Sequence, residues 1–401
     1  MRVKTGLDVL LEKELKLVEE MKVGLITNYT AVNSELIHLK DLLVSRKVNL
    51  VTIFAPEHGF WGSAQAGEYI KDEFDEETGV PIISLYRPAG KVKGPEYVID
   101  SILAPKARIP MTESLKEVEA LIFDIQDIGT RVYTYIWTMA LSMEASSKLD
   151  ILFIVLDRPN PINGVDVEGY VLENGFRSFV GMLPIAMRHG MTVGELALLF
   201  NERHGINADL KVIRMEGWER SMWFDETGLP WVMPSPNMPT LNTALAYPGM
   251  VLLEGTNISE GRGTTRPFEI AGAPWINGRK LVDSLRKYKL PGVLFRETRF
   301  VPTFSKYAGI KCSGIQLHVK ERKSFKPFLT ALCLLSEVIR QNPEKIEWIE
   351  RPGGGYYFDR LVGNDKVRKA LEEGIDPLDL YAESEISSKG FQMEREDYLL
   401  Y

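Results

Sequence analysis

Cysteine is scarce in this chain, because its 401 residues include only Cys312 and Cys333. Cys312 lies in a strand-like run and Cys333 in an apolar helical pattern, so we expect two buried thiols and no disulfide framework. An excess of positive charge is also lacking: 55 acidic residues outnumber 48 Lys and Arg and give a net charge of −7. This balance argues against nucleic acid or an anionic membrane as the main partner.

Long apolar runs are missing as well. No stretch approaches the roughly 18 apolar residues that a membrane-spanning helix needs. Residues 1–25 are charged throughout and lack the apolar centre of a signal peptide. We therefore expect a cytoplasmic protein if the chain is complete, and a secreted or periplasmic one if a leader has been removed.

Several common catalytic motifs are absent. No Gly-rich dinucleotide fingerprint follows the first predicted strand, and the chain has no G-x-S-x-G elbow, no H-E-x-x-H and no Cys/His cluster. These absences argue against a nicotinamide enzyme, an α/β-hydrolase and a zinc hydrolase. We expect no cofactor and no bound metal.

The pattern that is present alternates strands and helices. Near-continuous Val/Ile/Leu runs predict strands at 22–28, 48–56, 80–86, 120–125, 150–157 and 210–218, with helices such as 34–44 and 192–205 between them. Such strands indicate a parallel sheet that is covered on both faces. Near Ala271 the pattern changes to a helix at 278–288, strands at 299–303 and 314–319, and a helix at 325–341. We predict an α/β domain over 1–272 and a smaller α+β domain over 273–401.

Polar residues gather where the predicted strands end. Ligands of open parallel sheets bind beyond these carboxyl ends. Thr27 and Asn28 end the first strand, Glu57 and His58 follow the second, and Asp124, Gln126, Asp127, Asp157, Arg158 and Asn160 follow two later strands. One Asp after a strand is commonly a helix cap or turn former. Several such ends together predict one polar cleft.

Carboxylates, amides and aromatic residues are typical of carbohydrate sites. Glycoside hydrolysis needs a proton donor with a raised pKa and commonly a second carboxylate. Glu57 is the best candidate donor, because it follows a proline at a strand end among apolar residues that include Phe60 and Trp61. The alternative is an ion pair of Glu57 with Arg131 or Arg158. For His58, orienting Glu57, binding substrate and holding the turn remain open.

Six motifs carry a resemblance to a known family: FAPEHGFWG, FDIQDIGTRVYTYIWTM, VLDRPNPING, RHGMTVGELA, PSPNMPTLNTALAYPG and EGTNISEGRGTTRPFEIAGAPW. In this order, over 54–276, they resemble the exo-β-N-acetylmuramidases of the NamZ type, which remove N-acetylmuramic acid from the non-reducing end of peptidoglycan chains. The resemblance implies a Rossmann-like large domain, a smaller C-terminal domain, a cleft between them, and Glu57 of the PEHG motif as the catalytic acid. Trp61 stands where this family usually has an arginine, which puts the exact substrate preference in question.

The site expected from these motifs includes three catalytic residues, Glu57, His58 and Asp127. The expected substrate-binding residues are Asn28, Gln126, Arg131, Tyr133, Tyr135, Arg158, Asn160, His189, Asn237, Glu254, Asn257, Glu260, Arg262 and Arg266. If the acetamido group of the substrate is the nucleophile, a second carboxylate only orients it, and Asp124, Asp127, Glu254 and Glu260 are the candidates. The lactyl carboxylate of muramic acid calls for a cation, for which we expect Arg131, Arg262 or Arg266.

The expected partners are peptidoglycan-derived saccharides or muropeptides. Two other functions stay open at this point. One is a non-catalytic muropeptide- or sugar-binding protein on the same scaffold. The other is a metal-dependent amidase that uses Glu57 and His58.

Overall fold

The computed structural model describes residues 2–68, 70–86, 112–352 and 354–401. Among these residues, seven strands form one large sheet in the order β3-β4-β2-β1-β5-β6-β9. The strands are β1 (Lys22–Thr27), β2 (Asn49–Ala55), β3 (Glu73–Phe74), β4 (Pro81–Ser84), β5 (Ala120–Asp124), β6 (Leu152–Leu156) and β9 (Leu210–Ile213). All neighbours run parallel except β3 and β4. The predicted α/β class with a mainly parallel sheet is confirmed.

Helices cover both faces of the large sheet. In β5, Leu121 and Phe123 pack into the cluster that includes α4 (Tyr135–Lys148) and α5 (Val193–Glu202). Ala120 and Ile122 pack on the other face, towards α1 (Gly6–Val9) and α2 (Leu39–Ser45). Because successive side chains of a strand point to opposite faces, a strand covered on both sides is apolar throughout.

The helix expected over 34–44 begins later, at Leu39. The Asn33 side chain accepts the backbone N–H groups of Glu35 and Ile37, and Leu36 has a φ of 62°. These local bonds compete with a helix. The helix begins only after His38, whose ring accepts the Lys40 N–H.

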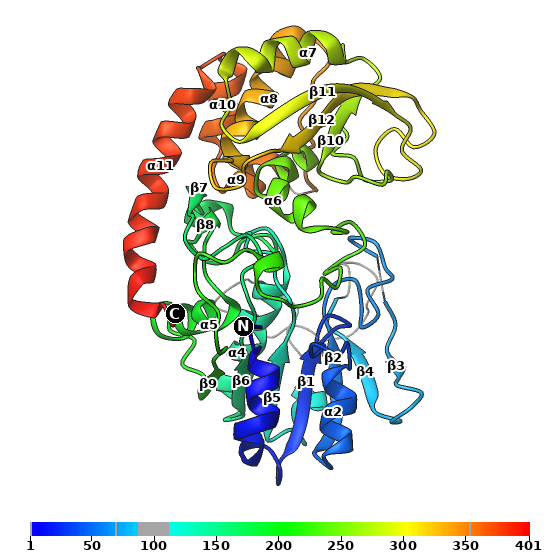
Figure 1. Ribbon diagram of the computed structural model, residues 1–401, viewed down its shortest axis with the longest axis vertical. Helices are drawn as coiled ribbons and strands as arrows, with labels where there is room; N and C mark the ends of the chain where they lie inside the picture. The colour runs from blue at the N-terminus through cyan, green and yellow to red at the C-terminus, as the bar shows by residue number, and fades with distance from the viewer. Residues whose placement is uncertain (1, 69, 87–111, 353) are drawn as a thin grey trace.

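A second lobe contains a smaller antiparallel sheet in the order β10-β12-β11. Its strands are β10 (Ile270–Ala273), β11 (Val293–Phe300) and β12 (Cys312–Val319), and its helices are α6 (Leu241–Met250), α7 (Gly278–Leu285), α8 (Pro327–Gln341), α9 (Tyr357–Val362) and α10 (Lys366–Glu372). Figure 1 shows this lobe above the large sheet. Cys312 and Cys333 lie here as buried, free thiols, as predicted.

The expected division after residue 272 cuts through β10. Residues Ile270–Ala273 pair with β12, and the preceding helix α6 packs against α8 of the second lobe. We propose a division near residue 240 instead.

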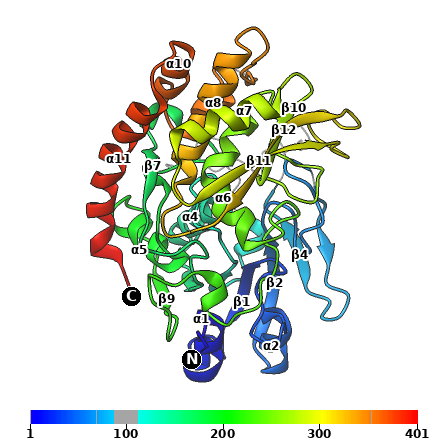
Figure 2. The ribbon, with the colours of Figure 1, turned by 45° about the horizontal axis from the view of Figure 1, so that its top comes forward.

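Helix α11 (Pro377–Glu394) connects the two lobes along one edge of the molecule. It lies on this edge in both views, and it brings the chain from the second lobe back beside α5 (Figures 1 and 2). On the way it packs on β7 (Glu168–Val171), which pairs with β8 (Ala186–Arg188). The remaining short helix, α3 (Thr112–Leu115), precedes β5.

The segment after α11 is anchored in the first lobe, which is the one that contains the large sheet. Arg395 Nη1 donates to the carbonyls of Gly164, His189 and Gly190. The Tyr401 hydroxyl donates to Asp157 Oδ2 at 2.7 Å, directly after strand β6. Burial raises the pKa of Asp157 to about 7. The first lobe is thus completed by a segment that follows the second lobe in sequence.

None of the helices in the described part of the chain combines the length and the apolar character that crossing a bilayer requires.

Candidate active site

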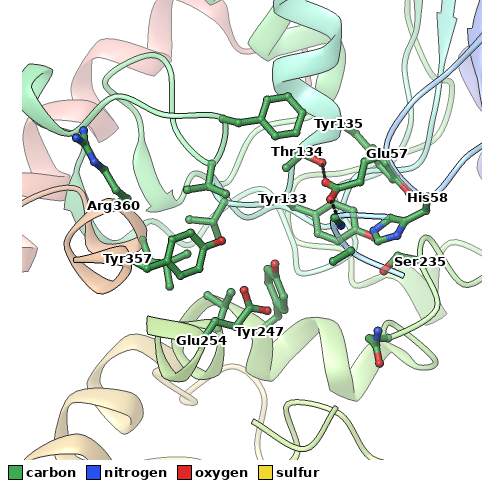
Figure 3. Close-up of a pocket in the computed structure, with 18 of the residues that line it drawn as sticks. Glu57, His58, Tyr133, Thr134, Tyr135, Ser235, Tyr247, Glu254, Tyr357 and Arg360 are labelled. Atoms are coloured by element: carbon green, nitrogen blue, oxygen red, sulfur yellow. Dashed lines mark hydrogen bonds between the residues drawn. The ribbon is translucent and has the colours of Figure 1, made fainter. Parts of the chain in front are cut away.

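A pocket of about 390 Å³ lies between the two lobes, within the size range of small-molecule sites. Residues that follow β2 and β5 form its wall on the first lobe, and α6, the segment after it and α9 form the wall on the second lobe. The lining comprises Glu57, His58, Ala66, Gly67, Tyr86, Val132, Tyr133, Thr134, Tyr135, Ser178, Phe179, Val180, Ser235, Asn237, Met238, Tyr247, Val251, Glu254, Arg262, Phe268, Arg351, Tyr357, Arg360 and Leu361. Figure 3 shows side chains such as Glu57, His58, Tyr247 and Glu254 directed towards this space, with Arg360 at its left edge.

Glu57 is held in the wall by two hydrogen bonds. Its Oε2 accepts from the Thr134 hydroxyl at 2.8 Å, and its Oε1 accepts from the Gly67 N–H at 3.2 Å. The residue is only 9% exposed. Neither arginine considered as its ion-pair partner is engaged with it, since Arg131 binds backbone carbonyls and Arg158 binds Asp124. The carboxyl group is therefore fixed in orientation and available to the pocket.

His58 holds the turn beside Glu57. It adopts a φ of 72°, a left-handed conformation that is uncommon outside glycine. Its Nδ1–H donates to the Ala64 carbonyl at 2.8 Å. Burial lowers the pKa of His58, although the Glu57 charge acts in the opposite direction. The imidazole is neutral near pH 7, and its Nε2 remains a hydrogen-bond acceptor.

Aromatic side chains form much of the pocket wall. The Tyr133 ring meets Tyr135 edge-on at 5.0 Å and Tyr247 at 5.8 Å. Tyr135 donates its hydroxyl proton to the Pro234 carbonyl at 2.6 Å. Burial raises the pKa of all three hydroxyl groups, so they stay protonated. Such a wall offers apolar faces for a sugar ring and hydroxyl groups that can donate hydrogen bonds.

On the second lobe, Glu254 faces the pocket and is paired with Arg262. The Arg262 Nη2 donates to Glu254 Oε1 at 2.6 Å, and its guanidinium lies 5.1 Å from the centre of the Phe268 ring. Arg262 also reaches Glu260, which in turn accepts from Lys306 at 2.9 Å. Burial raises the pKa of Glu254, while the Arg262 charge opposes this shift.

A third part of the wall comes from the segment around α9. Arg351 precedes a turn closed by hydrogen bonds between residues 351 and 355, and Tyr357 and Arg360 lie on α9. Figure 3 places Arg360 at the end of the pocket away from Glu57 and His58, with Tyr357 on the near side of it.

The structure brings only some of the expected site residues into this pocket. Those that line it are Glu57, His58, Tyr133, Tyr135, Asn237, Glu254 and Arg262. Those that do not are Asn28, Gln126, Asp127, Arg131, Arg158, Asn160, His189, Asn257, Glu260 and Arg266. The residues of the second set form hydrogen bonds and ion pairs outside the pocket, and these contacts explain why they do not line it.

Arg131 joins the two lobes and does not face the pocket. Its guanidinium donates to the carbonyls of Tyr170 and Ile185 in the first lobe and of Leu361 and Val362 at the end of α9. Burial lowers its pKa to about 9. Because Nη1 and Nη2 both donate to these carbonyls and the side chain is fully buried, Arg131 does not serve as the expected anchor for a lactyl carboxylate.

Six further residues form a buried polar layer at the strand ends. Arg158 pairs with Asp124 at 2.8 Å, so neither group is presented to the pocket. Asn28 accepts from Thr30, Gln126 donates to the Pro159 carbonyl, and Asn160 donates to the Met191 carbonyl. Asp127 Oδ2 accepts from the Gly129 N–H at 2.7 Å and lies 3.7 Å from His189 Nε2. These bonds shape the loops that carry the pocket residues.

The other expected residues have local partners. Asn257 donates to the Lys345 carbonyl near the surface, Glu260 is bound by Lys306, and the half-exposed Arg266 pairs with Glu269. Trp61 is 61% exposed and packs edge-on against Phe60 at 4.8 Å. It does not line the pocket.

Sequence reasoning missed several lining residues, among them Thr134, Ser235, Tyr247, Arg351, Tyr357 and Arg360. Thr134, Ser235 and Tyr247 lie inside motifs quoted above, and their positions were a usable signal. Arg351 and Tyr357 are the first and last residues of the sequence RPGGGYY (351–357), which carries no recognised motif, and Arg360 follows it. Within the described residues, no group of three His, Cys, Asp or Glu side chains is arranged to hold a metal ion.

Comparisons with known proteins cover the whole length of the chain. The family model described as "Exo-beta-N-acetylmuramidase NamZ, N-terminal" matches residues 23–242, and the corresponding C-terminal model matches residues 245–401. The chain is 45% identical, over all of its 401 residues and 92% of the relative, to the peptidoglycan beta-N-acetylmuramidase NamZ of Bacillus subtilis (strain 168).

Two solved structures share the fold. Both are DUF1343 family proteins from Bacteroides fragilis NCTC 9343. One is 34% identical with a TM-score of 0.87, and the other is 29% identical with a TM-score of 0.78. Each comparison covers 100% of this chain and 99% of the other.

Proposed function

This chain belongs to the exo-β-N-acetylmuramidase NamZ family, and from this premise we propose that it releases N-acetylmuramic acid from the non-reducing end of peptidoglycan fragments with Glu57 as general acid. The observation that carries the proposal is the position of Glu57. It is a nearly buried carboxyl group in the wall of an aromatic pocket, fixed by Thr134 and Gly67. The partners of the protein are saccharides derived from peptidoglycan.

In the first step, the protonated Glu57 donates its proton to the glycosidic oxygen while the bond from that oxygen to C1 breaks. Positive charge then develops at C1 and the ring oxygen. The acetamido oxygen of the same sugar attacks C1 and takes up this charge. Water later attacks C1, the bond between C1 and the acetamido oxygen breaks and restores the acetamide, and the water gives a proton to the Glu57 carboxylate, which restores the acid.

Glu254 is the carboxylate we propose to orient the acetamido group. Of the four acids considered for this role, Glu254 lines the pocket, whereas Asp124 is paired with Arg158 and Glu260 with Lys306. Asp127 is bound to the Gly129 N–H beneath the pocket. An ionised Glu254 can accept a hydrogen bond from the acetamide N–H, and the adjacent Arg262 stabilises that ionised form.

His58 acts through the turn and not through substrate in this proposal. Its Nδ1–H bond to the Ala64 carbonyl fixes the loop that follows Glu57. The aromatic wall of Tyr133, Tyr135 and Tyr247 excludes water from the sugar ring and packs against its face.

The experiment that tests this function is hydrolysis of a chromogenic N-acetylmuramide by the intact protein, with the matching N-acetylglucosaminide as comparison. Release of the chromophore together with free N-acetylmuramic acid supports the proposal. Binding of N-acetylmuramic acid with no hydrolysis of either substrate would favour a binding protein instead.

A further inference from the structure

The charges of the pocket are unevenly compensated. On the Glu254 side, Arg262 contacts both Glu254 and Glu260, and Lys306 contacts Glu260. Two cations therefore face two carboxylates, and this part of the wall is neutral. Arg262 has no charge left over for a substrate anion.

Arg351 and Arg360 lack such compensation. No carboxylate of the described residues lies within ion-pair distance of either guanidinium, although both side chains line the pocket. The nearby Asp359 is already bound by Arg368 at 2.9 Å. The two arginines are close enough that the charge of Arg351 is, after burial, the next cause that lowers the pKa of Arg360. Keeping two like charges together at one end of a pocket costs free energy unless an anion binds there.

Arg360 is held so that part of its guanidinium stays available. Its Nη1 donates to the carbonyls of Gly175 and Arg177 at 2.9 and 3.0 Å, and its Cζ lies 5.6 Å from the centre of the Phe176 ring. Nη2 and Nε have no partner among the described residues. A fixed guanidinium with free N–H groups is suited to bidentate binding of a carboxylate.

From this imbalance we infer that Arg351 and Arg360 form a subsite for a carboxylate carried on the O3 substituent of the muramic acid residue. The inference rests on the proposed function. Muramic acid differs from glucosamine by a lactyl ether at O3, which leaves the sugar ring at a different carbon from the scissile bond. Arg360 lies at the end of the pocket away from Glu57 (Figure 3), and Arg351 is close enough to affect its pKa, so a sugar whose C1 faces Glu57 can direct O3 towards these arginines. The expected lactyl anchor thus moves from Arg131, Arg262 and Arg266 to the segment around α9.

The carboxylate has two sources in peptidoglycan fragments. A peptide-free muramic acid offers the lactyl carboxylate itself. In a muropeptide this group is consumed in an amide bond, and a carboxylate of the peptide lies farther out. The test therefore uses three ligands: N-acetylglucosamine, N-acetylmuramic acid and N-acetylmuramyl-L-alanyl-D-isoglutamine.

The experiment is equilibrium binding by calorimetry to the full chain. Arg351→Gln removes a charge that makes no side-chain hydrogen bond to the described residues. Arg360→Lys keeps the charge but loses the guanidinium fork, and it spares the fold more than a neutral replacement because an ammonium can still reach the Gly175 carbonyl. Arg279→Gln is the matched control, since Arg279 is an exposed arginine on α7 of the same lobe.

We expect the wild type to prefer an acidic ligand over N-acetylglucosamine. Arg351→Gln and Arg360→Lys should each weaken binding of that acidic ligand about 10–100-fold, the scale of losing a hydrogen bond to a charged group, and leave N-acetylglucosamine unchanged. Arg279→Gln should match the wild type. A preference for N-acetylmuramic acid identifies the lactyl carboxylate, and a preference for the muramyl dipeptide identifies the peptide carboxylate.

Two results would overturn the subsite. One is equal affinity of the wild type for all three ligands, and the other is an unchanged acid preference in both arginine variants. Because these are binding measurements, they are independent of whether the protein hydrolyses a muramide. A failed hydrolysis assay would count against the proposed function and would leave the binding result to decide the subsite.

Discussion

The hydroxyl of Thr134 donates a hydrogen bond to Glu57 Oε2 at 2.8 Å. Glu57 follows strand β2, and Thr134 immediately precedes helix α4. The bond therefore joins two loops at the carboxyl edge of the large sheet. It fixes the rotation of the carboxyl group and directs it into the pocket, where a proton donor must meet the glycosidic oxygen.

Glu57→Gln should lower kcat on a muramide with a poor leaving group by about 10²–10⁴-fold, the usual effect of removing a general acid. A substrate whose leaving group needs little protonation should recover part of this loss. The measurement is steady-state kinetics on a pair of such substrates, with circular dichroism to verify the fold. Near-wild-type activity on both would remove Glu57 from the mechanism.

Thr134→Val should lower kcat about tenfold, because it removes a hydrogen bond to the reacting carboxyl group while keeping the side-chain shape. Thr134→Ser keeps the hydroxyl and should restore most of the rate. Thr138→Val serves as a control in the first turn of α4, since within the described residues the Thr138 hydroxyl bonds only to the Thr134 carbonyl. Equal rates for the Val and Ser variants of Thr134 would show that the hydrogen bond from its hydroxyl to Glu57 does not contribute to kcat.

Glu254→Gln should lower kcat by about 10²-fold or more, and a better leaving group should not rescue it. The reason is that Glu254 assists the acetamido group and not the departing oxygen. Comparing the rates of the Glu57 and Glu254 variants across leaving groups separates the two roles. If both variants were rescued to the same extent, the assignment of Glu254 to the acetamido group would fail.

Metal removal should leave the activity unchanged, because every step proposed for this site is carried by Glu57, Glu254 and the substrate. Dialysis against a strong chelator, followed by the muramide assay, is the measurement. Loss of activity that returns on adding a divalent cation would support the metal-dependent alternative instead.

Stability should fall as the pH drops from 6.5 to 4, partly through His38. Its Nε2–H donates to the Asn28 carbonyl at 2.9 Å, and its Nδ1 accepts the Lys40 N–H at 3.0 Å. The second bond needs the neutral ring, because a protonated Nδ1 cannot accept a hydrogen bond. Burial is the largest cause that lowers the pKa of His38 from 6.5 to about 4, although the bond to the Asn28 carbonyl acts in the opposite direction. Between these values the unfolded chain binds the extra proton, so the free energy of unfolding decreases by roughly 2–3 kcal/mol on this account.

His38→Asn tests this pH dependence, since Asn can also cap the helix that begins at Leu39. Urea unfolding at pH 6.5 and pH 4.5 should show a smaller difference for the variant than for the wild type. Parallel pH dependences of the two proteins would assign the loss of stability to other groups.

The large sheet could be predicted from sequence because its signal is local. Residues 22–28 and 120–125 are each mainly an apolar run, and such runs are typical of strands that are covered on both faces. Glu57 could be found for a related reason: it follows such a strand directly, and the carboxyl edge of a parallel sheet is where a ligand binds.

Arg131 could not be placed in this way. It lies two residues from Tyr133, which does line the pocket, but the direction of a loop side chain depends on what packs around it. Arg131 turns inward because four backbone carbonyls, two of them from α9, need a donor. Arg360 is the opposite case, because only the packing of the second lobe on the first brings it to a pocket that begins at Glu57.

The anchoring of Tyr401 on Asp157 has a consequence for how the protein is made. The contact spans 244 positions of the chain, and Arg395 likewise reaches back to Gly164 and Gly190. On a ribosome, the first lobe emerges long before these partners exist. Contacts between residues far apart in sequence form late in folding, and chains of this size commonly fold through intermediates. We therefore expect chains that stop short of Arg395 and Tyr401 to leave the region around Asp157 uncovered and protease-sensitive.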